Sequence, residues 1–317
     1  MPTMSRRVTS TIIFGALLSL VDTTPGRAQA PPPPTPKQVL TYQNLTVVRL
    51  NPLGLQNQFD IDFRLRLYDP GDSVVMAGNY VGLSLSPILT PGLMRLGVAA
   101  KFQPLAILKL EARWDYVNFF GNFDLLQSYA DPDADFSDSA LKDGGEAKQN
   151  YATDGWQATI DGELRARVGA LIVRTRAKLG YVEMALRGAD TVFYDQYYDL
   201  LLPGSGWFIT NDADVLVQVN EHLILGVRHS FADVFYRASD FEPDGTRTTD
   251  SAPTHRLGPL AAWTFFDEPG ASWNRPTIVL ILNWYLQHRF RTGDDVSQAM
   301  PYIVLGFAFG GDLYRIP

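Results

Sequence analysis

The feature that most constrains this chain is an alternation of apolar and charged residues with a period of two. Residues 59–67 read Phe-Asp-Ile-Asp-Phe-Arg-Leu-Arg-Leu. Successive side chains of a β-strand point to opposite faces, so this segment has one apolar face and one charged face. Similar alternation recurs at 108–116, 160–168 and 173–179. The fold must therefore place many strands between an apolar and a polar environment.

The amino terminus has the layout of a secretory signal peptide. Two arginines at positions 6 and 7 precede an apolar run at 11–21, and Ala28-Gln29-Ala30 follows with the small residues of a cleavage site. The apolar run is too short to span a bilayer as a helix. We expect a signal peptide over 1–30, with cleavage after Ala28 as the alternative, and a stiff proline-rich spacer over 31–37 in the periplasm.

Composition narrows the class of protein further. The chain has 317 residues, 46% of them hydrophobic, and a mean hydropathy of -0.06, which is too polar for a helical membrane protein. A net charge of -7 argues against a nucleic-acid partner. The absence of cysteine excludes disulfides, thiolate metal sites and thiol nucleophiles.

The remainder of the chain divides into twelve candidate strands and no buried helix of useful length. The predicted strands are 38–51, 56–69, 73–86, 93–103, 105–119, 154–168, 170–186, 206–219, 222–236, 254–267, 275–291 and 298–311. If both termini lie in the periplasm, every inward connection is short, whereas 120–153, 187–205 and 237–253 face outward and are the three longest. Short periplasmic turns and long outer loops are typical of bacterial outer-membrane barrels.

The final strand, with Tyr-Ile-Val-Leu-Gly-Phe-Ala-Phe at 302–309, is similar to the terminal strand of such barrels, although eight residues follow it. The whole mature chain thus resembles bacterial outer-membrane β-barrel proteins of the porin-like kind. The resemblance implies an all-β fold, with a single closed antiparallel transmembrane barrel of about 12 strands over 38–317. It also implies outer-membrane lipid, lipopolysaccharide and the barrel-insertion machinery as partners, and it leaves the oligomeric state open.

A charge at the lipid midplane of a barrel costs about 2–4 kcal/mol, so the charged faces are predicted to line the lumen. The acidic groups are expected towards the outer half and most of the basic groups towards the periplasmic half. The predicted lumen residues are Asp60, Asp62, Arg64, Arg66, Lys109, Glu111, Arg113, Asp161, Glu163, Arg165, Arg167, Arg174, Arg176, Lys178 and Arg289. They favour either a basic constriction that selects small anionic solutes or a salt-bridge ladder that fills the lumen.

Aromatic residues on the predicted outward face are candidates for the interfacial girdles of a membrane barrel, although aromatic enrichment is also common in ordinary strands. The candidates are Trp114, Tyr116, Trp156, Trp207, Trp263, Trp284 and Tyr302.

Two outer loops have unusual sequences. Loop 187–205 is apolar for a segment in water, and Tyr194, Tyr197 and Tyr198, with Trp207 beyond it, are predicted either to constrict the mouth and stack on a solute or to pack on the rim. In loop 120–153, acidic residues at 131, 133 and 135 have the spacing of an EF-hand, but Phe replaces its glycine and Lys its last glutamate. No metal site or cofactor is therefore predicted.

Catalysis is not expected. His229 and Ser230 are adjacent in a strand, so their side chains should face opposite sides and not form a base–nucleophile pair. His288 falls on the predicted lipid-facing register. Three functions remain, in descending order: a passive or weakly selective channel, a structural or surface-interaction barrel with a filled lumen, and a barrel-wall hydrolase.

Overall fold

The computed structural model describes residues 36–241 and 253–316. The expected signal peptide and most of the proline-rich spacer lie outside these residues. Within them, no helix is long and apolar enough to cross a membrane.

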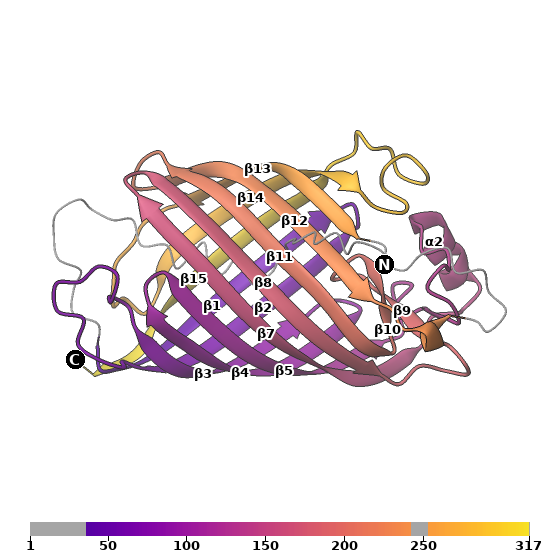
Figure 1. Ribbon diagram of the computed structural model, residues 1–317, viewed down its shortest axis with the longest axis horizontal. Coiled ribbons are helices and arrows are strands. Elements are labelled where there is room, and N and C mark those ends of the chain that lie inside the picture. The colour runs from indigo at the N-terminus through magenta and orange to yellow at the C-terminus, as the bar shows by residue number, and fades with distance from the viewer. Residues whose placement is uncertain (1–35, 242–252, 317) are drawn as a thin grey trace, which may run out of the picture.

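Twelve antiparallel strands close into one barrel, because the first strand pairs with the last (Figure 1). This confirms the predicted fold class and strand number. The barrel strands are β1 (Gln38–Leu50), β2 (Gly54–Leu65), β3 (Tyr80–Leu89), β4 (Leu93–Leu105), β5 (Leu108–Phe120), β7 (Ala152–Val168), β8 (Leu171–Met184), β11 (Ser205–Gln218), β12 (Leu223–Phe235), β13 (Thr254–Thr264), β14 (Asn274–Gln287) and β15 (Tyr302–Ile316).

The charged face of each strand points inward, as the alternation predicts. In β5, Glu111 and Asp115 are buried, whereas Leu110 and Trp114 on the other face are 40% and 46% exposed. The outer surface is therefore an apolar belt suited to lipid, and the lumen holds the ionic groups.

Several strand boundaries differ from the prediction, most of all those of β3, β14 and β15. β3 begins at Tyr80 instead of 73, because Asn79 is used in the preceding turn, where its side chain binds the backbone amides of Leu67 and Tyr68 at 3.0 Å. The inward connection predicted at 69–72 therefore spans 66–79. β14 stops at Gln287, and β15 is shifted to Tyr302–Ile316. The next inward turn lies at 106–107, after Pro104 and not at it.

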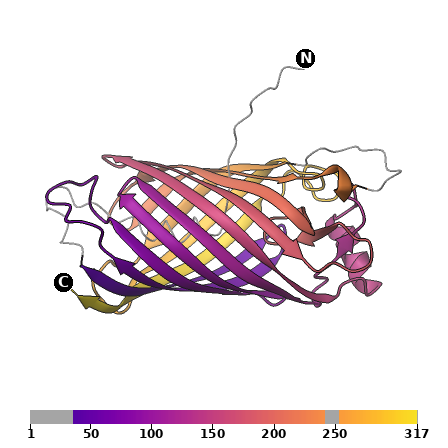
Figure 2. The ribbon, with the colours of Figure 1, turned by 60° about the horizontal axis from the view of Figure 1, so that its bottom comes forward.

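The long connections gather at one end of the barrel and fold over it (Figures 1 and 2). We take this as the outer end, since barrels of this kind have long extracellular loops. Its connections contain helix α2 (Asp138–Glu146), which is capped by Ser137, and a small sheet of β6 (Ser128–Tyr129), β9 (Val192–Asp195) and β10 (Leu200–Pro203). α2 is the one α-helix among the described residues, and its nine residues, of which only Leu141 and Gly144 are buried, agree with the expectation of no buried helix of useful length.

An apolar cluster anchors this outer cap. Phe119, Val182 and Phe208 on the barrel strands pack with Phe193 and Leu201 of the small sheet, and all five are nearly fully buried. The outer loops are therefore attached to the barrel mouth by a core of their own.

The aromatic girdle prediction fails for one residue. Trp114, Trp207, Trp263 and Trp284 all lie on the outward face, each 40–48% exposed. Tyr302, in contrast, is 1% exposed and points into the lumen beneath the Arg256 guanidinium, 4.4 Å from its ring centroid. Tyr302 opens β15 on the inward register, which it shares with the buried Val304 and Ala308.

Candidate functional site

The lumen wall is lined with ion pairs between side chains of the same strand or of strands one or two positions apart in the sheet. Asp62 binds Lys101 at 2.5 Å and Arg64 at 2.7 Å. Asp161 binds Arg176 at 3.1 Å and Lys178 at 3.2 Å. Because each of these carboxylates joins two cations, the basic and acidic groups interleave instead of separating into rings of one sign.

The adjoining part of the wall, formed by β8, β11 and β12, has the same design. Asp214 lies between Arg174 and Arg228, and both guanidinium groups donate to its carboxylate. Asp212 accepts from Ser230 at 2.6 Å and lies 3.0 Å from Arg228. All five side chains are nearly inaccessible, so this part of the lumen is filled. The ion pairs of the predicted salt-bridge ladder are therefore present in this part of the lumen.

Two cavities among the described residues lie along the inside of the barrel. The first, of about 40 Å³, lies among β2, β4, β5, β7, β8 and the outer cap, and the second, of about 130 Å³, lies near the ends of β1, β14 and β15 at the periplasmic mouth. Gln43 lines both cavities. The first is lined by Gln43, Gln58, Asp60, Ile88, Arg95, Lys101, Lys109, Glu111, Arg113, Asp115, Gln157, Arg176, Lys178, Tyr197 and Tyr198.

Cations outnumber acids in the lining of this first cavity, which has six basic and three acidic residues. Three further carboxylates, Asp62, Asp161 and Asp195, are not part of the lining but form ion pairs with cations that are. With these included, the charges balance, six against six. The cavity surface is therefore basic, whereas its surroundings are neutral.

The outer side of the cavity is roofed by the β9–β10 hairpin, which we call the plug (residues 192–203). Asp195 of the plug binds Arg95 of the wall at 2.8 Å. The rings of Tyr197 and Tyr198 lie 4.7 and 5.6 Å from the same guanidinium. The predicted loop tyrosines thus lie over the lumen, where they separate the first cavity from the outside.

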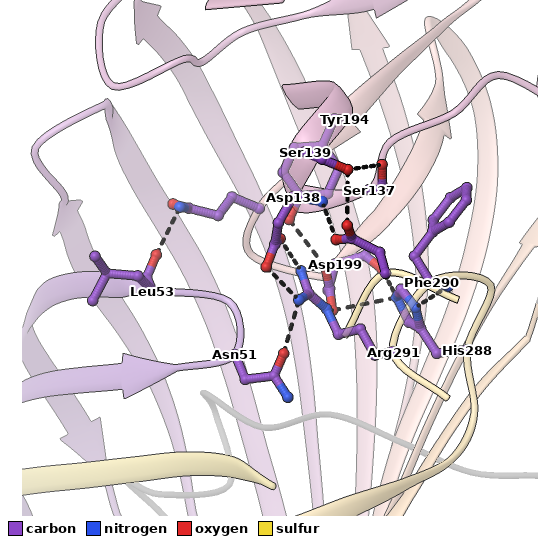
Figure 3. A network of polar contacts seen from close by, with 12 residues as sticks. Asn51, Leu53, Ser137, Asp138, Ser139, Tyr194, Asp199, His288, Phe290 and Arg291 are labelled. Atoms are coloured by element: carbon purple, nitrogen blue, oxygen red, sulfur yellow. Dashed lines mark hydrogen bonds and ion pairs between the residues drawn. The ribbon is translucent and has the colours of Figure 1, made fainter. Parts of the chain in front are cut away.

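A second contact of the plug centres on Asp199, which is 2% exposed (Figure 3). Arg291 donates to its carboxylate through Nε at 2.7 Å and Nη2 at 3.0 Å. The Tyr194 hydroxyl donates at 2.9 Å, the Tyr285 hydroxyl lies 2.9 Å away, and His288 Nε2 lies at 3.3 Å. Every lone-pair direction of the buried carboxylate therefore has a polar partner.

Arg291 extends this network to two other outer connections. It donates to Asn51 of the β1–β2 turn at 2.8 Å and to both oxygens of Asp138 in α2 at 2.9 and 3.0 Å. We call Asp199, Arg291, Asn51, Asp138, Tyr194, Tyr285 and His288 together the latch. It joins four of the outer connections and holds the plug in the mouth.

The electrostatics of the latch favour an ionised Asp199. Burial alone would raise its pKa, but Arg291 and His288 hold the pKa of this carboxyl well below its usual range. Burial and the Asp199 charge raise the pKa of Tyr194, so its hydroxyl keeps the proton that it donates. The latch is thus a fixed carboxylate–guanidinium pair at neutral pH.

The structure corrects the predicted position of His288. Because β14 ends at Gln287, the chain leaves the strand before His288, and this side chain turns inward to Asp199 and is 1% exposed. The alternation of β14 does not extend to it, nor to Arg289 and Arg291.

Two other predicted site residues lie elsewhere. Arg289 is not in the lumen: it donates to the carbonyls of Pro132, Asp133 and Ala134 in the outer cap at 2.6–3.0 Å. The guanidinium thereby attaches the acidic segment of loop 120–153 to the β14–β15 connection. Trp207 points outward, 48% exposed, because it lies on the lipid-facing register of β11.

The other predicted lumen residues lie on the inward face or at its periplasmic rim. Glu111 and Glu163 are buried beside Lys109 and Arg165 at 3.9 and 3.8 Å. Arg66 follows the end of β2, and Arg165 and Arg167 donate to backbone carbonyls of the periplasmic turns. His229 and Ser230 point to opposite sides, as predicted, since Ser230 alone faces the lumen.

Several central residues of the lumen and the plug are not among those predicted from the sequence. Arg95, Lys101, Arg228 and Asp195 all lie in pairs that define the lumen or the plug. A stricter reading of the alternation in β4 and β12 identifies the three cations. Asp199 had no such signal, since the segment around it is apolar and short.

Comparison of the sequence with protein-family models and with curated proteins finds no match. Solved structures of similar fold include an outer membrane channel from Pseudomonas putida F1, with 11% identity, 91% of this chain and 99% of that chain covered, and a TM-score of 0.41. The KdgM porin has 8% identity, 86% and 99% coverage and a TM-score of 0.38. LpxR from Salmonella typhimurium has 8% identity, the same coverages and a TM-score of 0.36. Similarity this weak carries no argument about what the barrel does.

Proposed function

We propose that this protein is an outer-membrane channel for small polar solutes, and that the plug closes its outer mouth in the conformation described. The observation that carries the proposal is the pair of polar cavities that share Gln43 beneath a separately folded plug. A barrel needed only as a scaffold has no use for a basic chamber beneath a latched hairpin. Solute passage requires movement of the plug, since the first cavity holds only about 40 Å³.

A weak preference for small anions follows from the lining of this chamber. Lys101, Arg113 and Lys178 expose their charges to the cavity, and part of the compensating charge, on Asp62 and Asp161, lies behind the lining. Rings or clusters of one sign set ion selectivity in narrow pores. Because every cation has a nearby acid, the preference is modest.

A filled structural barrel is the second candidate, and the dry ion pairs around Asp214 favour it. The two functions differ in a planar bilayer. The refolded mature protein, with folding verified by a heat-modifiable gel shift, is expected to show stepwise conductance, and anions are expected to carry more current in a salt gradient. A folded protein that conducts neither before nor after removal of the plug contradicts the channel. Cation-preferring conductance contradicts only the anion preference.

A further inference from the structure

Two histidines meet on the outside of the barrel, away from the lumen and the plug. His229 lies in β12 and His255 in β13, with Nε2 of the first 3.3 Å from Nδ1 of the second. In the strand register, His229 is opposite Leu257 and His255 is opposite Phe231. The two imidazoles are therefore diagonal neighbours on one face, which lets their rings converge at a centroid distance of 5.4 Å.

This face is the lipid-facing one. The residues flanking the pair along the strands, Arg228, Ser230 and Arg256, are at most 5% exposed and point into the lumen. On the side of the histidines, Val227 and Leu257 are 48% and 40% exposed as part of the apolar belt. Ionisable side chains in such a belt are costly, and their presence points to a function.

The two histidines form no polar contact with lumen residues or with other described parts of the fold. Within residues 36–241 and 253–316, the only polar contact of either imidazole is with the other. Phe231 packs against His255 with ring centroids 4.9 Å apart, which limits the rotation of that ring. The two nitrogens are thus held 3.3 Å apart in an apolar surround.

We propose that His229 and His255 form a binding site for a transition-metal ion that prefers imidazole, such as Zn²⁺, Ni²⁺, Co²⁺ or Cu²⁺. Metal–nitrogen bonds of 2.0–2.1 Å at a tetrahedral angle separate two ligand nitrogens by about 3.3 Å. The observed separation is 3.3 Å. Neutral imidazole is the ligand form, and two nitrogens this close do not both carry protons.

The site offers two protein ligands and leaves the other positions open. The described residues contain no group of three or more His, Asp or Glu arranged to hold a metal ion. Oxygen ligands, from water or from lipid phosphate, complete the coordination. His255 is the second residue of β13, at the outer end of that strand. An open site of this kind binds its ion exchangeably.

The proposal is tested by titrating Co²⁺ into the folded, untagged barrel in a detergent without phosphate. We expect one Co²⁺ per chain, with the intense visible absorption of a four-coordinate ion. His229→Gln and His255→Gln should each weaken binding at least tenfold, because a single imidazole remains. His222→Gln is the matched control and should bind as the wild type does, since His222 lies in a periplasmic turn beside Trp263.

Repeating the titration in vesicles that contain phosphate lipids distinguishes the sources of oxygen. Tighter binding there assigns lipid phosphate as the further ligand, and equal binding assigns water. The gel shift verifies that each variant is folded, and the His255→Gln variant suffices if His229→Gln does not fold. Absence of Co²⁺ binding, or binding that both substitutions leave unchanged, overturns the proposal.

Discussion

Replacing Asp199 with asparagine should open the channel. The side chain keeps its shape, but the buried carboxylate that accepts from Arg291 and Tyr194 loses its charge. Arg291 would then be compensated only by Asp138, whose side chain is 48% exposed. Removing one partner of a buried ion pair costs about 3–5 kcal/mol.

Because asparagine retains one acceptor oxygen, we take the lower limit of about 3 kcal/mol, which corresponds to about a hundredfold shift from the closed to the open state. Single-channel recordings should show this as a large rise in open probability. Protease sensitivity of the plug should rise in parallel. Asp143→Asn, the same chemical change on an exposed residue of α2, is the matched control and should leave both unchanged.

A double variant tests whether the pair is the cause. Asp199→Asn combined with Arg291→Gln removes both charges, so no uncompensated cation stays buried, and the mouth should close better than in Asp199→Asn alone. If Asp199→Asn has the open probability and protease resistance of the wild type, the latch does not hold the plug. An additive double variant would show that Asp199 and Arg291 act separately.

Three further predictions concern charge and pH. Lys101→Met and Lys178→Met should each move the reversal potential towards cations, because the basic chamber loses a charge; an unchanged potential would place selectivity elsewhere. Arg289→Ala should raise proteolysis in the loop 121–151 at least tenfold, since charged hydrogen bonds contribute about 1.5–3 kcal/mol each. The Asp199 pKa is lowered in the closed state, so its stabilisation is complete above its unperturbed pKa and is lost on acidification. Open probability should therefore stay constant from neutral pH to about pH 5 and rise below about pH 4, and Asp199→Asn should not show this rise.

The barrel itself could be predicted from the sequence because its two environments impose a strict period of two. In the middle of β5 and β8, the inward residues are charged and the outward ones are apolar, as Lys109, Glu111 and Arg113 alternate with Leu110 and Ala112. The alternation gives a wrong prediction where it continues in the sequence beyond the end of a barrel strand. Alternating polar residues at 287, 289 and 291 extend the pattern of β14, yet the last two belong to the outer cap.

The latch could not be predicted because it depends on tertiary contacts between distant loops. Asp199 and Arg291 are separated by 92 residues, and Asn51 is 240 residues from Arg291. Nothing in the local sequence of the plug distinguishes Asp199, which becomes the centre of the network, from Asp190, which binds Ser128. Periodicity identifies which face a residue occupies, but not which loop will fold onto it.

The latch also crosses the place where the barrel closes. Asn51 directly follows β1, Arg291 lies beyond β14, and β15 joins these two regions by pairing with both. An incompletely assembled sheet, in which β15 has not yet met β1, cannot bring Asn51 to Arg291. The latch can consequently form only after β1 has paired with β15. A barrel that is still being inserted therefore has a plug that the latch does not hold, whereas in the closed barrel the latch holds the plug in the mouth.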